Sequence, residues 1–141
     1  MIQRLLVAAS LYGAALTAGN AADLAVTVNG MKDGTGFVIA TIFDGEKNFL
    51  NRPGAFASVR LRAQPAQLSF ALKNLPPGKY AVVAFHDQND NGKLDFDPSG
   101  QPTEIYGFSN GAREAGGPPK FTDAAFEIGN QSKTIEIEMT Y

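Results

Sequence analysis

Residues 75–85 read Leu75-Pro76-Pro77-Gly78-Lys79-Tyr80-Ala81-Val82-Val83-Ala84-Phe85. The two prolines and the glycine indicate a turn, because proline restricts the backbone and glycine permits turn conformations. The run that follows, from Tyr80 to Phe85, is apolar at odd and even positions alike. A strand with this pattern is covered on both faces, so we predict that it lies inside a β-sheet.

Alternating apolar and polar residues on both sides of this stretch predict further strands. The alternating segments are residues 24–28, 37–43, 58–62, 67–72, 124–128 and 134–141. With the central strand they make about seven strands, which predicts an all-β fold, a single antiparallel β-sandwich of two sheets. Residues 87–121 contain no clear strand. Loops of about 35 residues in compact domains are usually functional or held in place by something, so chemistry is expected here.

The composition excludes several classes of function. The chain has 141 residues, 12 Lys and Arg against 14 Asp and Glu, and no cysteine. This length predicts one domain. The formal net charge of -2 lacks the basic excess that nucleic-acid binding needs, so we expect no nucleic-acid partner. Without cysteine there are no disulfides, thiolate nucleophiles, iron–sulfur clusters or cysteine-based zinc sites.

The first 21 residues have the order of a cleavable signal peptide: a basic start at Arg4, an apolar middle, and small residues at Gly19 and Ala21. The apolar run of about 14 residues is short for the roughly 20 that a membrane span needs. We therefore expect cleavage after Ala21 or Ala22, a domain formed by residues 22–141, and no stable membrane span afterwards. The expected location is periplasmic or secreted.

Residues 87–95 are close to the pattern of a calcium-binding loop. With Asp87 at position 1 of that pattern, the later positions are filled by Asn89 (3), Asn91 (5), Gly92 (6), Lys93 (7) and Asp95 (9). In a tightly turning loop, side-chain oxygens at a spacing of two can converge on one hard cation. Lys93 would contribute only its backbone carbonyl. The spacing therefore predicts calcium as a bound ion.

One calcium ligand is missing from this pattern. Position 12, which normally supplies a bidentate glutamate, is Pro98. We expect Asp97 or Glu104 to complete the coordination shell, and the affinity to be weak. The alternative is a purely structural loop, in which the Asn and Asp side chains bond to backbone amides without an ion.

A second candidate site lies in residues 104–113, an aromatic and amide-rich segment. Aromatic side chains beside amides and arginine are typical of surfaces that bind a glycan or a protein, so an envelope glycan or peptide is a possible partner. The candidate contact residues are Tyr106, Phe108, Asn110 and Arg113. Alternatively, Tyr106 and Phe108 close the end of the sandwich, while Gly107 and Gly111 permit turns.

Catalytic residues are scarce. His86 is the only histidine, and its neighbour Asp87 would point to the opposite face of a strand. A relay from these residues to Ser109 would need a local distortion. We therefore expect a protein that is not an enzyme, with a hydrolase that uses His86 as the alternative.

Several motifs occur together in an order that resembles a known family. They are residues 75–87, which end in His-Asp, residues 89–95, the run Pro102-Thr103-Glu104, and residues 106–110, which read Tyr-Gly-Phe-Ser-Asn. Over nearly the whole mature chain the sequence resembles DUF2141, a family of exported bacterial proteins. The resemblance implies a small exported β-rich protein and no activity, because none is assigned to the family. The Pro-Pro-Gly-x-Tyr entry into a strand also resembles prealbumin-like and collagen-adhesin B-type sandwiches, so the expected sandwich is prealbumin-like or Ig-like.

Overall fold

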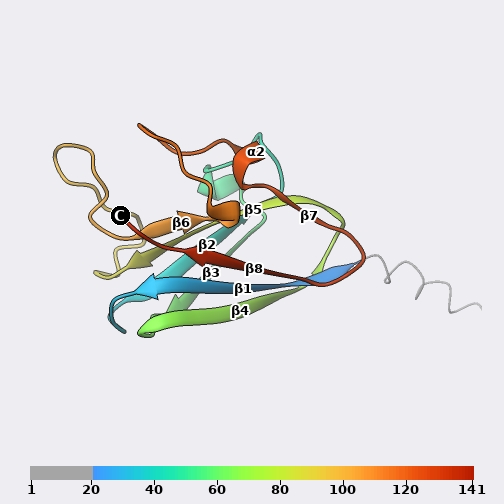
Figure 1. Cartoon of the computed structure of the whole chain (residues 1–141), viewed down its shortest axis with the longest axis horizontal. Helices are drawn as coiled ribbons and strands as arrows, with labels where there is room; N and C mark the ends of the chain where they lie inside the picture. The colour runs from blue at the N-terminus through green and yellow to red at the C-terminus, as the bar shows by residue number, and fades with distance from the viewer. Residues whose placement is uncertain (1–20) are drawn as a thin grey trace, which may run out of the picture.

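The computed structural model describes residues 21–141, and two β-sheets face each other across one core (Figure 1). The three-stranded sheet has the order β4-β1-β8, and the larger sheet has the order β3-β2-β5-β6, with β7 paired to β5. The predicted all-β sandwich is confirmed. The expected signal peptide lies outside the described residues, apart from Ala21. No helix among the described residues is long and apolar enough to cross a membrane.

The smaller sheet is built around β1 (Ala22–Met31), which lies between β4 (Ala66–Leu75) and β8 (Lys133–Glu138). Leu24, Val26 and Val28 point inward and are fully buried, as their alternation predicts. β1 is antiparallel to β4 but parallel to β8. This parallel pair is a correction to the all-antiparallel expectation, and no local sequence pattern distinguishes it.

The larger sheet is centred on β5 (Gly78–Asp87), the strand predicted from its apolar run. β2 (Phe37–Phe43) pairs with one edge of β5, and β6 (Tyr106–Phe108) pairs with the other. The remaining strands are β3 (Ala57–Arg62), which pairs with β2, and β7 (Phe126–Ile128), which pairs with the first residues of β5. Ala81, Val82 and Ala84 are fully buried, so β5 is covered on both faces.

Strand β6 lies inside the stretch in which no strand was expected, so that expectation was wrong for these three residues. Three residues are too few to show an alternation. The strand also connects the two sheets, because Tyr106 and Thr140 exchange backbone hydrogen bonds of 2.9 and 3.0 Å. Gly107 permits this approach: a Cβ atom there would lie 2.3 Å from the carbonyl oxygen of Glu138.

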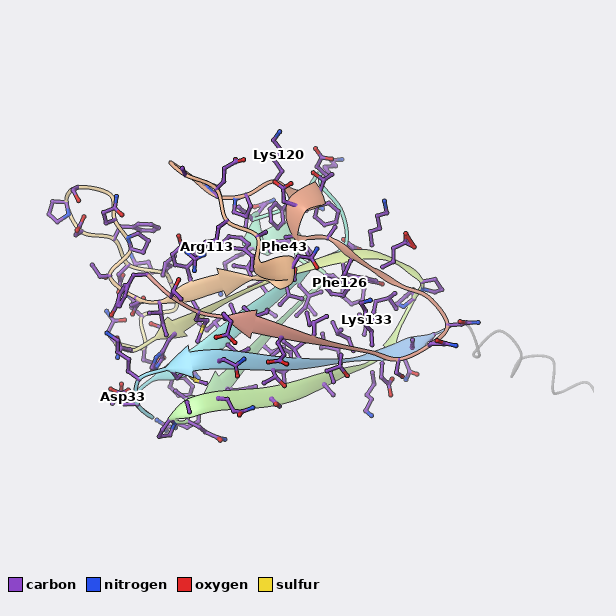
Figure 2. The ribbon with its side chains drawn as sticks, in the orientation of Figure 1. Asp33, Phe43, Arg113, Lys120, Phe126 and Lys133 are labelled. Atoms are coloured by element: carbon purple, nitrogen blue, oxygen red, sulfur yellow. The ribbon has the colours of Figure 1, made fainter. Side chains whose placement is uncertain are left out.

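A second apolar cluster covers part of the outer face of the larger sheet. Three short helical segments accompany it: η1 (Arg52–Gly54), η2 (Ser109–Gly111) and α2 (Phe121–Ala124). Phe43 packs there against Phe108 and Phe121, and the ring of Phe49 meets that of Phe43 at 5.5 Å. Figure 2 shows Phe43 on the side of the sheet that faces α2. One end of the outer face is therefore closed, and the remainder is available for a site.

Candidate functional site

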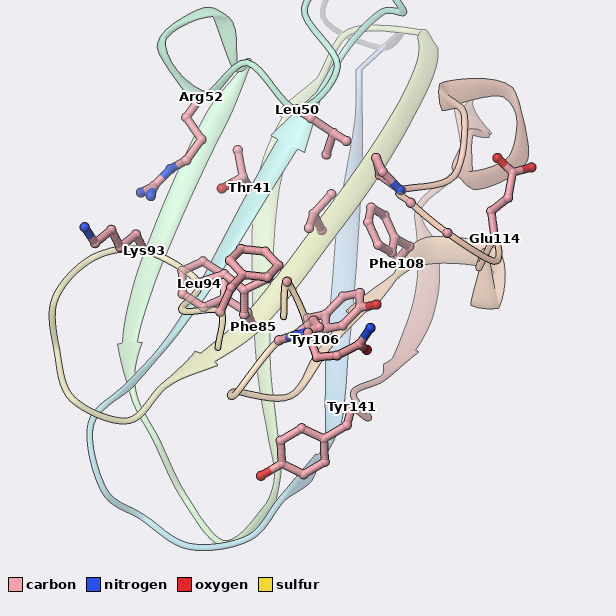
Figure 3. Close-up of a pocket in the computed structure, with 18 of the residues that line it drawn as sticks. Thr41, Leu50, Arg52, Phe85, Lys93, Leu94, Tyr106, Phe108, Glu114 and Tyr141 are labelled. Carbon is pink, nitrogen blue, oxygen red and sulfur yellow. The ribbon is translucent and has the colours of Figure 1, made fainter. Parts of the chain in front are cut away.

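A groove of about 830 Å³ opens on the outer face of the larger sheet (Figure 3). Strands β2, β5 and β6 form its floor. Because side chains alternate across a strand, every second residue of these strands points into the groove while its neighbours fill the core. The floor residues are Thr41, Phe43, Val83, Phe85, Tyr106 and Phe108.

Two loop segments form the walls of the groove. Lys93, Leu94, Phe96 and residues 99–102, from the second half of the calcium-type loop and the residues after it, line one wall. Glu114 and residues 116–118 line the other. The lining is completed by Leu50, Arg52 and the C-terminal Tyr141. The groove is thus assembled from segments that are far apart in the sequence.

Exposed apolar side chains gather at this groove. The exposed large apolar residues in the described part of the chain are Leu50 (38%), Phe56 (41%), Phe96 (58%) and Tyr141 (58%). All of them except Phe56 line the groove. Single exposed apolar residues are ordinary, but their concentration in one concave place is typical of a binding site.

Charged side chains lie at opposite sides of the groove. Figure 3 shows Arg52 and Lys93 on one side and Glu114 on the other, with Phe85 and Tyr106 between them. Within residues 21–141 the ion pairs are Arg60–Asp90 and Lys73–Asp23, so none of the three groove charges is paired there. Arg52 donates one hydrogen bond of 2.5 Å from Nη1 to the carbonyl oxygen of Gly92. Its other N–H groups stay available, because a guanidinium carries five donors.

The calcium-type loop begins at the buried carboxylate of Asp87. Its Oδ1 accepts a hydrogen bond from the backbone N–H of Asn91 at 3.2 Å, and its Oδ2 accepts one from Gly92 at 2.8 Å. Gly92 has φ +80, which places it in the left-handed region that the sharp turn at position 6 requires. The spacing seen in the sequence therefore produces a tight loop folded around Asp87.

The amides of Asn89 and Asn91 bracket the carboxylate of Asp95. Each donates a hydrogen bond of 2.7 Å from Nδ2, one to each carboxylate oxygen. These two hydrogen bonds lower the pKa of Asp95, and the bond from Asn91 has the larger effect. The arrangement matches the ion-free alternative. Calcium would need the amide oxygens, so both amides would have to rotate to bind it.

Glu104 joins the two ends of this loop. Its buried carboxylate accepts hydrogen bonds from the backbone N–H of Gln88 at 3.1 Å and of Asp95 at 3.2 Å. Burial raises the pKa of Glu104, and the charges of Asp95 and Asp87 raise it further. The carboxylates of Asp95 and Asp87 therefore lie near enough to Glu104 to disfavour its charged form.

The other expected calcium ligands are placed differently. Asp97 lies in a separate turn, where its Oδ1 accepts hydrogen bonds from Ser99 and Gln101. Lys93 directs an exposed side chain to the groove wall. No group of three or more His, Asp or Glu side chains in residues 21–141 is arranged to hold a metal ion. Calcium therefore stays a prediction, and it would depend on the Asn side chains and backbone carbonyls as well.

The four residues predicted as ligand contacts in residues 104–113 divide into two pairs. Tyr106, half-buried, and Phe108, buried, lie in the groove floor. Asn110 donates a hydrogen bond of 2.7 Å to the carbonyl oxygen of Ala125, and Arg113 donates one of 2.5 Å to that of Tyr106. Arg113 also stacks over the Tyr106 ring at 4.1 Å. Asn110 and Arg113 thus hold the wall in place, and ligand contact by these four residues stays a prediction.

The sequence patterns do not indicate several other groove residues, among them Leu50, Arg52, Phe96, Glu114 and Tyr141. One signal was available, since Phe96 stands between two aspartates in a polar loop, where a large apolar residue is unexpected. Nothing local to the other four indicates that they meet.

The residues considered for catalysis make structural hydrogen bonds. His86 is buried, and its Nε2 lies 2.7 Å from the carbonyl oxygen of Thr35, so Nε2–H is the donor. Ser109 is fully buried, and its Oγ accepts a hydrogen bond from the N–H of Val82 and donates one to the carbonyl oxygen of Ala124. The Ser109 hydroxyl therefore completes the backbone hydrogen bonding of β5 and α2.

Comparison with known proteins identifies a family. The family model described as "Uncharacterized protein conserved in bacteria (DUF2141)" matches residues 26–136. No curated protein matches the chain closely. Among solved structures, the pilus-presented adhesin Spy0125 (Cpa) is similar at 17% sequence identity and a TM-score of 0.36, covering 84% of this chain and 26% of the adhesin chain. The chain thus spans about a quarter of that structure, and so loose an overlap carries no argument about function.

Proposed function

The chain belongs to the DUF2141 family of uncharacterised bacterial proteins, and from its geometry we propose that it is an exported, non-enzymatic binding protein. Its ligand, an envelope glycan or peptide, lies in the groove between residues 93–102 and residues 114–118. Strands β2, β5 and β6 provide a rigid floor, and loops provide the walls, which is a common arrangement for binding sites.

The observation that carries this proposal is the gathering of exposed apolar side chains at the groove. Leu50, Phe96 and Tyr141 expose apolar surface to water at one concave place, which costs solvation free energy in the free protein. A ligand that covers these side chains recovers that free energy. Polar groups around them, such as Arg52 and Glu114, would orient it.

Replacing Phe96 tests the groove. Phe96→Ala removes an exposed ring from the wall, so the fold should change in stability by no more than about 0.5 kcal/mol. The matched control is Phe56→Ala, which removes another exposed ring outside the groove. Ligands selected from glycan and peptide arrays would then be measured by calorimetry against all three proteins.

We expect Phe96→Ala to weaken binding about tenfold or more, which corresponds to a free energy of about 1.4 kcal/mol. Phe56→Ala should bind like the wild type. Equal affinities of the wild type and Phe96→Ala, or the absence of any ligand from both arrays, would contradict the proposal.

A second candidate function is calcium binding by residues 87–97, which would order the groove wall. The supporting observation is that Glu104 bonds to the backbone N–H groups of Gln88, the neighbour of Asp87, and of Asp95, while no basic side chain in residues 21–141 forms an ion pair with any of the three acidic residues. A hard cation would offset the repulsion that Asp87 and Asp95 exert on the charged form of Glu104. Leu94 and Phe96 flank Asp95 and line the groove, so an ion at Asp95 would hold that wall.

Thermal unfolding in chelator and in increasing calcium, with magnesium as the control ion, tests this candidate. For a dissociation constant of about 0.1 mM, a 100-fold excess of calcium should stabilise the fold by about 2.7 kcal/mol. Asp95→Asn should remove this shift, whereas Asp97→Asn should keep it, because Asp97 bonds within its own turn. Asp87→Ala should also abolish calcium binding. Because the buried Asp87 carboxylate accepts hydrogen bonds from two backbone amides, this variant tests folding as well. No shift up to about 10 mM calcium, above the usual weak extracellular range, would leave the loop purely structural.

A further inference from the structure

We propose that the ligand of the groove is an extended peptide with an acidic group at one end, apolar side chains in the middle and a basic group at the other end. This inference rests on the proposed binding function and adds the class and charge order of the ligand. It follows from the order of the side chains across the groove (Figure 3).

The charges at the two sides of the groove have opposite signs. Arg52 and Lys93 are exposed on one side, and Glu114 is exposed on the other. None of the three forms an ion pair within the described residues. Charged groups across an interface are arranged to be complementary, because like charges repel and reject a wrong partner. A ligand with an anionic group toward Arg52 and Lys93 and a cationic group toward Glu114 would match these charges.

The middle of the groove is apolar and aromatic. Phe85 and Tyr106 form the floor between the charged sides, with Leu94 beside Phe85. Phe96 also lines the groove. A neutral glycan would leave all three charges unmatched, and an acidic glycan would be repelled by Glu114. A peptide carries both signs and apolar side chains on one backbone, so it matches the whole groove.

The peptide would be recognised through its side chains. β6 forms part of the floor, but its outer edge is not open to an added strand, because Tyr106 already exchanges backbone hydrogen bonds with Thr140. Strand addition to β6 is therefore excluded as the binding mode. Pockets for side chains and the two charged sides remain as the sources of specificity.

A positional-scanning library of N-acetylated, C-amidated heptapeptides tests the inference, because blocked ends leave side chains as the only charges. The wild-type protein should enrich peptides that carry Asp or Glu near one end, Lys or Arg near the other, and Leu, Phe or Tyr between them. Glu114→Lys should change the preference at the basic position to an acidic residue. Lys93→Glu should lower the affinity for the selected peptides tenfold or more and favour a basic residue at the acidic position.

Exposed charges outside the groove supply the matched controls. Glu46→Lys and Lys120→Glu make the same changes away from the groove and should leave the enriched sequences unchanged. If Phe96→Ala abolishes binding but Glu114→Lys and Lys93→Glu leave the charge preference unchanged, the groove function stands and the charge order is overturned. If the groove selected a glycan and no peptide, the groove function would stand and the assignment of a peptide ligand would be overturned. If Phe96→Ala bound the selected peptides as tightly as the wild type does, both the groove function and the peptide ligand would be overturned.

Discussion

Ser109→Ala should destabilise the protein strongly, because one hydroxyl group satisfies two buried backbone groups. The Oγ of Ser109 accepts a hydrogen bond of 2.9 Å from the N–H of Val82 and donates one of 2.6 Å to the carbonyl oxygen of Ala124. Ser109, Val82 and Ala124 are all fully buried, so water cannot replace the hydroxyl. The bond also continues the pairing of β5 beyond the point where the β6 ladder ends at Phe108.

The size of the expected loss of stability follows from the two backbone groups that would lose their hydrogen-bond partner. A buried donor or acceptor left without a hydrogen bond costs about 1–3 kcal/mol, so two of them cost about 2–6 kcal/mol. The total free energy of unfolding of a domain is about 5–15 kcal/mol, so this loss is a large fraction of it. For a domain of this size, even the lower value should reduce the unfolding midpoint by roughly 8 °C.

Chemical and thermal unfolding of the wild type and the variant measure this loss. Ser58→Ala, at an exposed position of β3, is the matched control and should change stability by no more than about 0.5 kcal/mol. Hydrogen exchange adds a local readout, since the Val82 amide should lose protection more than its neighbours in β5. If Ser109→Ala proved as stable as Ser58→Ala, the assignment of this hydroxyl as a structural bridge would be refuted.

Two further predictions concern the junction of the sheets and the pH dependence of the loop. Gly107→Ala should destabilise the fold by about 1–3 kcal/mol in chemical denaturation, because the new Cβ would lie 2.3 Å from the carbonyl oxygen of Glu138. Gly117→Ala meets no atom within 4 Å and should be nearly neutral; equal losses in the two variants would contradict the close approach. For Glu104, burial and then the neighbouring carboxylates raise its pKa above the unfolded value of 4.5. Stability from protonated Glu104 is therefore complete below the unfolded pKa and is lost as the pH rises through the folded pKa. The free energy of unfolding of the wild type minus that of Glu104→Gln should accordingly fall as the pH rises above about 4.5, and a flat difference would argue against the burial of this carboxylate.

Much of the fold could be predicted from local patterns. The alternation of Leu24, Val26 and Val28 and the doubly apolar run of β5 both correspond to buried strands in the structure. Each of these segments is long enough for its own pattern to indicate whether one face or both faces are buried. β6 is too short for such a signal, and its three residues are a strand because β5 supplies the pairing. The parallel pairing of β1 and β8 was likewise beyond local reasoning, because it depends on the path of the intervening chain.

Part of the candidate site could likewise be predicted from local sequence. The tight loop could be predicted because its residues interact with near neighbours in sequence. The spacing that indicates it is that of Asp87, Asn89, Asn91 and Asp95, with Gly92 at the turn. The sequence left the choice between Asp97 and Glu104 open, and the structure places Glu104 beside the loop, because the chain returns there after the turn at residues 97–101.

The groove, in contrast, required the folded chain. Leu50, Phe96 and Tyr141 come from segments with no local pattern in common, and they meet because strands β2, β5 and β6 lie side by side and send alternate side chains to one outer face. Local sequence encodes which face of a strand is apolar and which loop turns tightly. It does not encode which distant loops border a given face, because that depends on strand order and on contacts between residues remote in the chain.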